Sequence, residues 1–260
     1  MADHKDRYAL VTGASSGIGY ELAKLFAKDG KNLVIVARNE SRLEQVKAEL
    51  ENRYQIRVKV LPKDLSDSKA PSEIFSELEK DNISVDVLVN NAGLGVYGMF
   101  SETDLQKELE MIQVYIAATT HLTKLFLKKM LENKSGKILN VASGVAFLPV
   151  PLWSVYSASK AYVLYFSEAL ANELRGTGVS VTCLCPPQTE TPFFKRANME
   201  DAKIAKGKKM DAATAAEAGY MALKRGKVVA IPGLKSKSLG FLIRITPRNV
   251  ITKVARSMME

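Results

Sequence analysis

The sequence contains few of the residues that bind metals or form disulfides. Among its 260 residues there are two histidines, His4 and His121, and two cysteines, Cys183 and Cys185. Two isolated histidines supply neither a histidine-rich metal site nor a histidine-based catalytic triad, so we expect no metal centre. The cysteines are two positions apart on one predicted strand. That separation is long for a relaxed disulfide, and we expect both to be core thiols.

Long apolar runs and repeats are also missing. The sequence has no run of about 18 apolar residues that could span a bilayer. Residues 1–7 are too polar for a signal peptide. There is no repeat of about 20–50 residues, which argues against a solenoid or a propeller. We therefore expect a soluble, cytoplasmic protein.

Positive charge is in excess, with a formal net charge of +9. The basic residues are scattered and accompany no nucleic-acid-binding motif, so we expect no nucleic acid partner. A cationic groove would favour a cofactor that carries phosphates. Residues 235–260 mix basic and apolar side chains in a C-terminal basic amphipathic extension. This extension lies on a membrane surface, at a subunit contact or over the substrate cleft, and the membrane is not the favoured choice.

The pattern of apolar runs indicates an α/β fold. With 260 residues, of which 47% are hydrophobic, the chain can bury one core and is short for two. Seven strand-like runs alternate with helical patterns, at residues 8–11, 33–37, 58–61, 85–90, 137–142, 179–184 and 227–231. We predict a single domain over residues 1–260, built as a Rossmann-like, doubly wound parallel sheet of about seven strands with helices on both faces.

A glycine-rich turn joins the first predicted strand to the first predicted helix. Gly13 would permit the tight turn, Gly17 the close approach of a pyrophosphate, and Gly19 the close packing of helix on strand. The helix N-terminus would face the anion. The G-x-x-x-G-x-G spacing differs from the commoner dinucleotide fingerprint but serves the same purpose. The cofactor-binding candidates in this turn are Gly13, Ser15, Ser16, Gly17, Ile18 and Gly19.

The residues after the second predicted strand bear on the choice of cofactor. Arg38 stands where a carboxylate would accept a hydrogen bond from the ribose 2′-hydroxyl of NAD, and Arg42 follows soon after. An arginine can instead pair with the 2′-phosphate of NADP. Glu40 is close, but it belongs to the start of the next predicted helix. The sequence therefore predicts NADP(H).

Ser143, Tyr156 and Lys160 form the pattern that points most directly to catalysis. Tyr156 and Lys160 are four positions apart, so on a helix they share one face and the ammonium can lie close to the phenol. A phenol titrates near pH ~10 in water, and a lysine cation beside it makes the phenolate accessible at neutral pH. Together with Ser143, this pattern predicts proton-coupled hydride transfer.

These motifs together resemble the short-chain dehydrogenase/reductase family, from about residue 8 to about residue 192. They occur in the family's order and spacing, namely Thr12–Gly19, Asp64 after the third strand, Asn90–Gly93, Ser143, and Tyr156 with Lys160. The resemblance implies contacts with the cofactor beyond the glycine turn. Asp64 and Leu65 would contact the adenine. Asn91, Ala92 and Gly93 would close the far side of the groove. Thr189 and Thr191 would contact the nicotinamide carboxamide.

The resemblance also implies roles for the catalytic residues. Ser143 would hydrogen-bond the substrate carbonyl, and Tyr156 would donate a proton to it as hydride arrives. Lys160 would hold the nicotinamide ribose and lower the pKa of Tyr156. Members of the family often assemble through helices near residues 101–132 and 156–175, so we expect a homodimer or a homotetramer.

Two positions depart from the family pattern. Many members have an asparagine about 28 residues before the serine, where it positions a water that passes protons to the lysine. Tyr115 stands there in this chain. Either its hydroxyl substitutes, or a helix distortion recruits Gln113, or the enzyme is slow. Pro187 follows Pro186 where the family often has glycine, and a second proline stiffens that segment.

Apolar and aromatic residues flank the predicted catalytic residues along the chain. They are Leu94–Tyr97, Val145–Pro149, Leu152, Trp153, Phe193 and Phe194. They favour a ketone, aldehyde or secondary alcohol with an apolar body over a small sugar, although several of them could simply pack the loops. Residues 190–210 are polar with a helical rhythm, and we predict that they form a mobile lid over the substrate.

The primary functional hypothesis is an NADPH-dependent carbonyl reductase with Tyr156 as proton donor. A second hypothesis is a 3-oxoacyl thioester reductase, for which the sequence offers no acyl-carrier signature beyond its late basic residues. A third is a non-catalytic NADP-binding sensor or scaffold, motivated by Tyr115. The motifs do not determine the natural substrate, its stereochemistry or the direction of the reaction, because these depend on the shape of the pocket.

Overall fold

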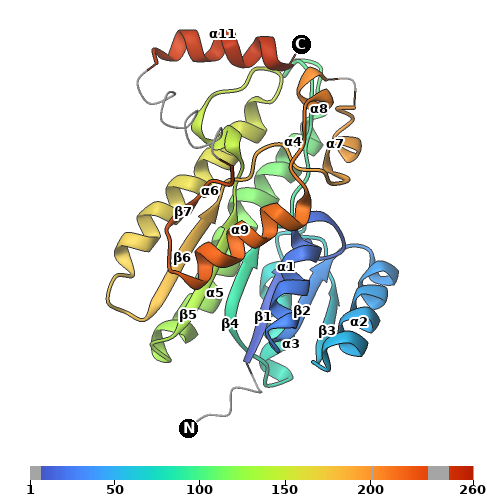
Figure 1. Cartoon of the computed structure of the whole chain (residues 1–260), viewed down its shortest axis with the longest axis vertical. Coiled ribbons are helices and arrows are strands. Elements are labelled where there is room, and N and C mark those ends of the chain that lie inside the picture. The colour runs from blue at the N-terminus through green and yellow to red at the C-terminus, as the bar shows by residue number, and fades with distance from the viewer. Residues whose placement is uncertain (1–6, 201, 234–245, 260) are drawn as a thin grey trace.

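A computed structural model describes residues 7–200, 202–233 and 246–259 of the chain. Within these residues the strands form one seven-stranded parallel sheet in the order β3-β2-β1-β4-β5-β6-β7 (Figure 1). The strands are β1 (Arg7–Thr12), β2 (Asn32–Ala37), β3 (Val58–Pro62), β4 (Ser84–Asn90), β5 (Gly136–Val141), β6 (Val179–Leu184) and β7 (Val229–Ala230). The strand order runs outward in both directions from β1 and β4. The predicted doubly wound parallel sheet is therefore confirmed.

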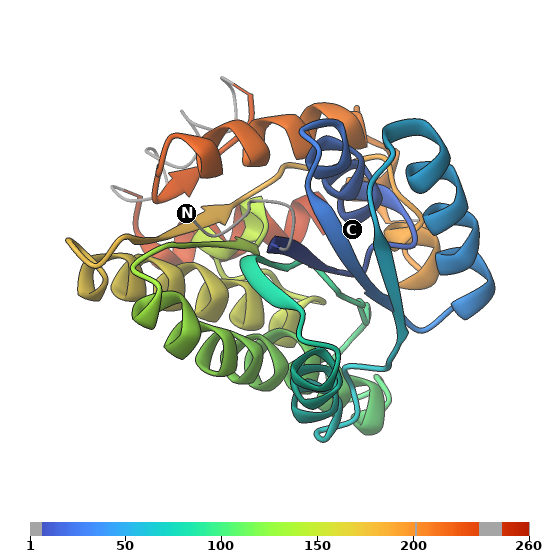
Figure 2. The same cartoon turned by 90° about the horizontal axis from the view of Figure 1, so that it is seen from below.

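Helices cover both faces of this sheet, as the view in Figure 2 shows. One face carries α1 (Gly17–Lys28), α2 (Glu40–Tyr54) and α9 (Ala212–Lys224). The other face carries α3 (Ala70–Lys80), α4 (Leu105–Ile112), α5 (Thr119–Glu132) and α6 (Ser154–Glu173). A π-helical segment, η2 (Gln113–Ala118), connects α4 to α5 without a break. Layers of helix, sheet and helix thus enclose strands that are buried on both sides.

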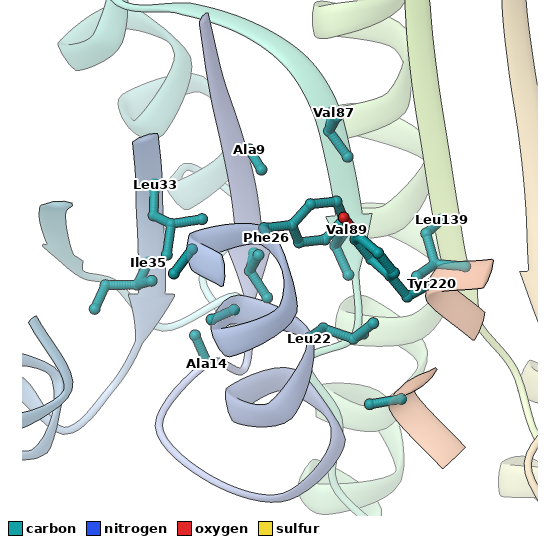
Figure 3. Close-up of a cluster of buried hydrophobic side chains, with 14 of the residues drawn as sticks. Ala9, Ala14, Leu22, Phe26, Leu33, Ile35, Val87, Val89, Leu139 and Tyr220 are labelled. Carbon is teal, nitrogen blue, oxygen red and sulfur yellow. The ribbon is translucent and has the colours of Figure 1, made fainter. Parts of the chain in front are cut away.

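Alternation along the strands divides the core between the two faces. In β1, Ala9 and Val11 face α1 and α9, whereas Tyr8 and Leu10 face the helices of the opposite layer. In the first of these cores the rings of Phe26 and Tyr220 meet edge to face, 5.0 Å apart (Figure 3). Because both faces are apolar, the strands appear in the sequence as continuous apolar runs, which explains why they were predictable.

Further elements lie at the carboxyl end of the sheet. They are the 3₁₀-helix η3 (Gly144–Phe147) and the helices α7 (Phe193–Arg196), α8 (Lys203–Lys206) and α11 (Arg248–Met259), of which α11 runs across the top of Figure 1. The segment predicted to be a lid contains α7 and α8. Of the predicted C-terminal extension, residues 235–245 and 260 lie outside the described residues, and much of the remainder forms α11. None of the helices in the described ranges has the length and apolar character needed to cross a membrane.

Two local predictions can be compared directly with the structure. The last strand is shorter than residues 227–231, because β7 pairs only with β6 and Pro232 follows closely, and proline has no N–H to extend a ladder. Cys183 and Cys185 are free, buried thiols, with sulfur atoms 3.8 Å apart. The prediction of two core thiols is confirmed.

Candidate active site

The carboxyl ends of the strands open into one cavity of about 1110 Å³. This is the edge of an open α/β sheet at which ligands bind in folds of this kind. Every site residue predicted from the sequence lines the cavity except Gly19 and Arg42. The lining residues among those predictions are Gly13, Ser15, Ser16, Gly17, Ile18, Arg38, Asp64, Leu65, Asn91, Ala92, Gly93, Ser143, Tyr156, Lys160, Thr189 and Thr191.

The glycines of the first turn are required by its geometry. Gly13 and Gly17 have φ values of +68° and +57°, in the left-handed region that other residues rarely adopt. A Cβ on Gly17 would lie 2.8 Å from the Thr191 side chain, and one on Gly19 would lie 2.4 Å from the Gly13 carbonyl oxygen. Gly19 therefore lets the turn fold back on itself, which explains why it does not line the cavity.

Hydrogen bonds join this turn to the end of β4. The Thr12 hydroxyl donates to the Val89 carbonyl at 3.1 Å and accepts from the backbone N–H groups of Asn91 and Ala92 at 2.9 and 3.0 Å. The Asn91 side-chain amide in turn donates to the Thr12 carbonyl at 2.8 Å. The first and fourth strands thus present their loops to the cavity as one unit.

The N-terminus of α1 fits the pyrophosphate of a dinucleotide. Its N-cap residue, Ser16, makes no side-chain capping hydrogen bond, and the first turn contains no acidic residue. Free N–H groups at a helix N-terminus attract anions, and Ser16, Gly17 and Ile18 all line the cavity. The donors present at this end of the cavity are therefore of the right kind for phosphate oxygens.

Two arginines lie near the end of β2. The Arg38 guanidinium lies 3.8 Å from the Asp64 carboxylate, and the two side chains are 68% and 45% exposed. The Arg42 side chain donates to the Ser15 carbonyl at 3.3 Å and to Gln45 at 3.0 Å. Arg38 is thus held loosely at the cavity wall, whereas Arg42 supports the glycine turn from outside the cavity.

The three predicted catalytic residues come together at the end of β5. Ser143 caps η3 by accepting a hydrogen bond from the Val145 N–H at 3.3 Å. Tyr156 lies in the first turns of α6, with its ring stacked on Trp153 at 4.2 Å. Burial raises the pKa of the Tyr156 phenol above its usual value, and a hydrogen bond between the Ser143 and Tyr156 hydroxyls acts in the opposite direction.

Lys160 is buried one turn after Tyr156. Its ammonium donates a 2.8 Å hydrogen bond to the Val141 carbonyl, and burial lowers its pKa to about 7. Its Nζ lies 5.8 Å from the centre of the Tyr156 ring but 3.8 Å from that of Tyr115. Burial of the phenol is the largest influence on the pKa of Tyr156, and the lysine lies closer to the Tyr115 ring than to the Tyr156 ring.

The chain from residue 7 to residue 202 matches the family model described as short chain dehydrogenase. That match covers more than half of the chain. The protein belongs to the short-chain dehydrogenase/reductase family. The family resemblance drawn from the glycine turn, Ser143, Tyr156 and Lys160 is therefore confirmed, and the chain is an oxidoreductase of this family.

Two curated relatives of this short-chain dehydrogenase differ in how much of their length is matched. An uncharacterised oxidoreductase of Staphylococcus saprophyticus is 34% identical over 225 residues, covering 86% of this chain and 94% of the relative. A very-long-chain 3-oxoacyl-CoA reductase of Phaeosphaeria nodorum is 38% identical over 183 residues, covering 68% of this chain and 53% of the relative. This chain thus spans about half the length of the fungal enzyme.

Two solved structures share the fold of this short-chain dehydrogenase over nearly its whole length. One is a short-chain dehydrogenase from Sphingobium yanoikuyae in complex with NADPH, with 29% identity, a TM-score of 0.82, and coverage of 93% of this chain and 96% of that one. The other is a bulky-bulky ketone specific alcohol dehydrogenase from Comamonas testosteroni, with 29% identity, a TM-score of 0.78, and coverage of 95% and 96%.

The structure adds cavity residues that were not predicted from the sequence. Arg196 of α7 donates to the Ser16 hydroxyl at 3.4 Å, joining the predicted lid to the glycine turn. Val250, Val254 and Met258 of α11 line the cavity and are spaced one helical turn apart. That i, i+4, i+8 spacing of apolar residues could have indicated one apolar face of a helix. No feature of the sequence distinguished Arg196 from the other basic residues of its segment.

Most of the predicted apolar wall does line the cavity. The residues concerned are Leu94–Tyr97, Val145, Phe147, Leu148, Trp153, Phe193 and Phe194. The Phe193 ring lies 5.5 Å from the Tyr156 ring, and a Cβ on Gly95 would lie 2.9 Å from it. Ala146, Pro149 and Leu152 do not line the cavity. Ala146 and Leu152 pack against apolar neighbours, which is the loop packing that the sequence left open as an alternative, whereas Pro149 is exposed.

Proposed function

We propose that this short-chain dehydrogenase uses NADPH to reduce the carbonyl group of a ketone or aldehyde with an apolar body. The observation that carries the proposal is that the catalytic residues and Arg38 line the same cavity. Ser143, Tyr156 and Lys160 line it beside β5, and Arg38 lines it beside β2, three strands along the sheet from β5. A dinucleotide laid across the strand ends would reach from one group to the other.

The proposed cofactor contacts follow the cavity wall. NADPH supplies a hydride when it is bound. The N-terminus of α1 would hold its pyrophosphate, and Arg38, with Arg42 behind it, would hold the 2′-phosphate. Asp64 and Leu65 would flank the adenine. The nicotinamide end would be held by Asn91, Ala92, Gly93, Lys160, Thr189 and Thr191. The NADPH complex of the Sphingobium relative supports this choice of cofactor.

The protonation states of the catalytic residues favour reduction. Because burial raises the pKa of Tyr156, its phenol is protonated at neutral pH and can serve as an acid. Ser143 would donate to the carbonyl oxygen of the substrate. Tyr156 would then pass its proton to that oxygen as the carbonyl becomes an alcohol. The cationic form of Lys160 would bind the ribose hydroxyls and favour proton release from Tyr156.

The substrate class is proposed from the walls of the cavity. Aromatic rings surround Tyr156, and α11 extends the apolar wall with Val250, Val254 and Met258. Such walls favour a substrate with a bulky or elongated apolar body. The relative specific for bulky-bulky ketones supports a free ketone. The fungal reductase favours a second candidate, a 3-oxoacyl thioester. Residues 190–210 would close over either substrate as a lid.

Purified protein should be assayed for NADPH and NADH oxidation against a panel of substrates. The panel contains bulky aryl ketones, alkyl ketones, aldehydes, and matched pairs of 3-oxo esters and 3-oxoacyl thioesters. We expect turnover with NADPH and preference for apolar ketones. Faster turnover of the thioester than of its ester would favour the second candidate. Tight NADPH binding without turnover of any substrate would contradict the proposal and indicate a cofactor-binding scaffold.

We also propose that the protein forms a homodimer or homotetramer through α4, α5 and α6. Apolar side chains on two of these helices are exposed in the single chain, with Leu105 at 68%, Leu109 at 48% and Tyr165 at 62%. Exposed apolar residues gathered on helices are typical of subunit contacts. Light scattering should give a dimer or tetramer mass for the wild type, and a monomer mass would contradict this assembly.

A further inference from the structure

Tyr115 occupies an unusual place beside the catalytic residues. It lies in η2, where the helix between α4 and α5 widens into a π-helix, and it is 3% exposed. Such widened turns in helices are frequent at functional sites. The helix distortion considered in the sequence analysis is therefore present. It brings Tyr115 to the cavity wall, whereas Gln113, at the start of the same segment, does not line the cavity.

The hydroxyl of Tyr115 hydrogen-bonds the backbone. It donates a 2.7 Å hydrogen bond to the Leu94 carbonyl, in the loop after β4. The ring passes so close to Gly93 that a Cβ there would lie 2.4 Å from the hydroxyl oxygen. The hydroxyl proton is thus already used in a hydrogen bond to a backbone carbonyl. This argues against the hydroxyl as a substitute for the asparagine that many family members have at this position.

The face of the Tyr115 ring contacts the Lys160 ammonium instead. The 3.8 Å between Nζ and the ring centre is well within the range of cation–π contacts, which extend to about 6 Å. Lys160 is 4% exposed, and the attraction strengthens when water is excluded. The ring of Tyr156 meets that of Tyr115 edge to face at 5.7 Å. One aromatic side chain therefore contacts both catalytic partners.

The charge of Lys160 has few other sources of stabilisation. The titratable groups that face it are Tyr115 from η2, Tyr156 from its own helix, and the thiols of Cys183 and Cys185 from β6. The Val141 carbonyl of β5 accepts one of its protons. The two phenols and the Cys185 thiol are neutral near pH 7, because burial raises the pKa values of the phenols, and a hydrogen bond with Cys183 together with burial raises that of the Cys185 thiol. A π face is then a major support for a buried ammonium.

We propose that Tyr115 is a positioning residue whose ring holds the Lys160 ammonium in place and favours its charged form. This inference rests on the proposed function in assigning Lys160 a catalytic role. Burial brings the pKa of Lys160 to about 7, so the fraction of Lys160 that is charged near neutral pH is sensitive to the contact with the Tyr115 ring. Removing the ring lowers the pKa of Lys160, so the charged form is lost at a lower pH.

The test compares Tyr115→Phe, which keeps the ring, with Tyr115→Leu, which removes it. The readout is kcat for NADPH-dependent reduction from pH 5.5 to pH 9. We expect the basic limb of the Tyr115→Phe profile to match that of the wild type. In Tyr115→Leu its midpoint should fall by about 1 pH unit, because the charged form of Lys160 has lost the support of the ring. Equal midpoints for Leu and wild type, or equal shifts for Phe and Leu, would overturn the proposal.

A second measurement does not depend on activity. Lysines labelled with ¹³C at Cε are titrated by NMR, with the Lys160 signal assigned from Lys160→Arg. The titration midpoint of Lys160 should be lower in Tyr115→Leu than in the wild type and should equal the wild-type value in Tyr115→Phe. This holds whether or not the protein reduces any carbonyl. If Tyr115→Leu does not fold, Tyr115→Met, whose long and flexible apolar side chain has no π face, takes its place. An unchanged midpoint in the folded non-aromatic variant would refute the contact.

Discussion

Replacing Arg38 by alanine should separate the two nicotinamide cofactors. The Arg38 side chain is 68% exposed, and its pairing with Asp64 at 3.8 Å is a surface ion pair worth at most about 1 kcal/mol. Folding should therefore change little, with Tm within about 4 °C of the wild type. If the guanidinium binds the 2′-phosphate of NADPH, its loss removes hydrogen bonds to a charged group.

The expected loss of NADPH affinity follows from the strength of hydrogen bonds to charged groups. Hydrogen bonds to charged groups contribute about 1.5–3 kcal/mol, which corresponds to an NADPH Kd raised about 10- to 150-fold. NADH has no 2′-phosphate, so its Kd should stay within about twofold of the wild-type value.

Fluorescence titration of both cofactors measures this difference, and the control is Arg225→Ala. Arg225 is an exposed arginine at the end of α9 that does not line the cavity, so its replacement makes the same change in net charge. Equal weakening of NADPH and NADH by Arg38→Ala, or no change in either, would refute the assignment of Arg38 to the 2′-phosphate.

Two further predictions concern the lining of the cavity and the stability of the fold. In the wild type, kcat/KM should rise about fourfold for each methylene added to the alkyl chain of a ketone, because each methylene is buried against the cavity wall. Val254→Asp should abolish this rise and leave the kcat/KM of short ketones unchanged. The remote control, Met221→Asp, should show the same rise as the wild type. The same rise in Val254→Asp would show that α11 does not contact the substrate. Gly178→Ala should cost about 1–3 kcal/mol more in urea unfolding than Gly176→Ala. Both glycines have positive φ, +84° and +79°, but a Cβ on Gly178 would lie 1.9 Å from the Lys134 carbonyl oxygen, whereas one on Gly176 meets nothing within 4 Å. Equal losses would contradict the steric argument.

Much of the fold was predictable because local sequence and tertiary position agree. Strands buried on both faces must be apolar throughout, so β1, β2 and β4 could be recognised without knowledge of their neighbours. The glycine turn was equally legible, because positive φ at Gly13 and Gly17 admits few other residues. The short β7 was overestimated, since an edge strand has one neighbour to define its ends.

The candidate site was predictable only in part. Tyr156 and Lys160 lie on one helix, so their proximity followed from spacing alone. The position of Tyr115 depends on a π-helical turn and on the hydrogen bond to Leu94, and neither leaves a mark in the sequence around residue 115. The same holds for the pKa of Tyr156. The sequence suggested an effect of the neighbouring lysine, whereas the burial of Tyr156 depends in part on Phe193, which only the tertiary fold brings to it.

The most direct test of the proposed chemistry is Tyr156→Phe, assayed for NADPH-dependent reduction of the best ketone alongside an NADPH binding titration. The change removes the proposed proton donor and keeps the ring that stacks on Trp153. We predict that kcat falls by about 10²- to 10⁴-fold, the usual contribution of a general acid, while the NADPH Kd changes less than about threefold. Turnover within a few fold of the wild type would contradict the assignment of Tyr156 as the proton donor, and with it the proposed mechanism.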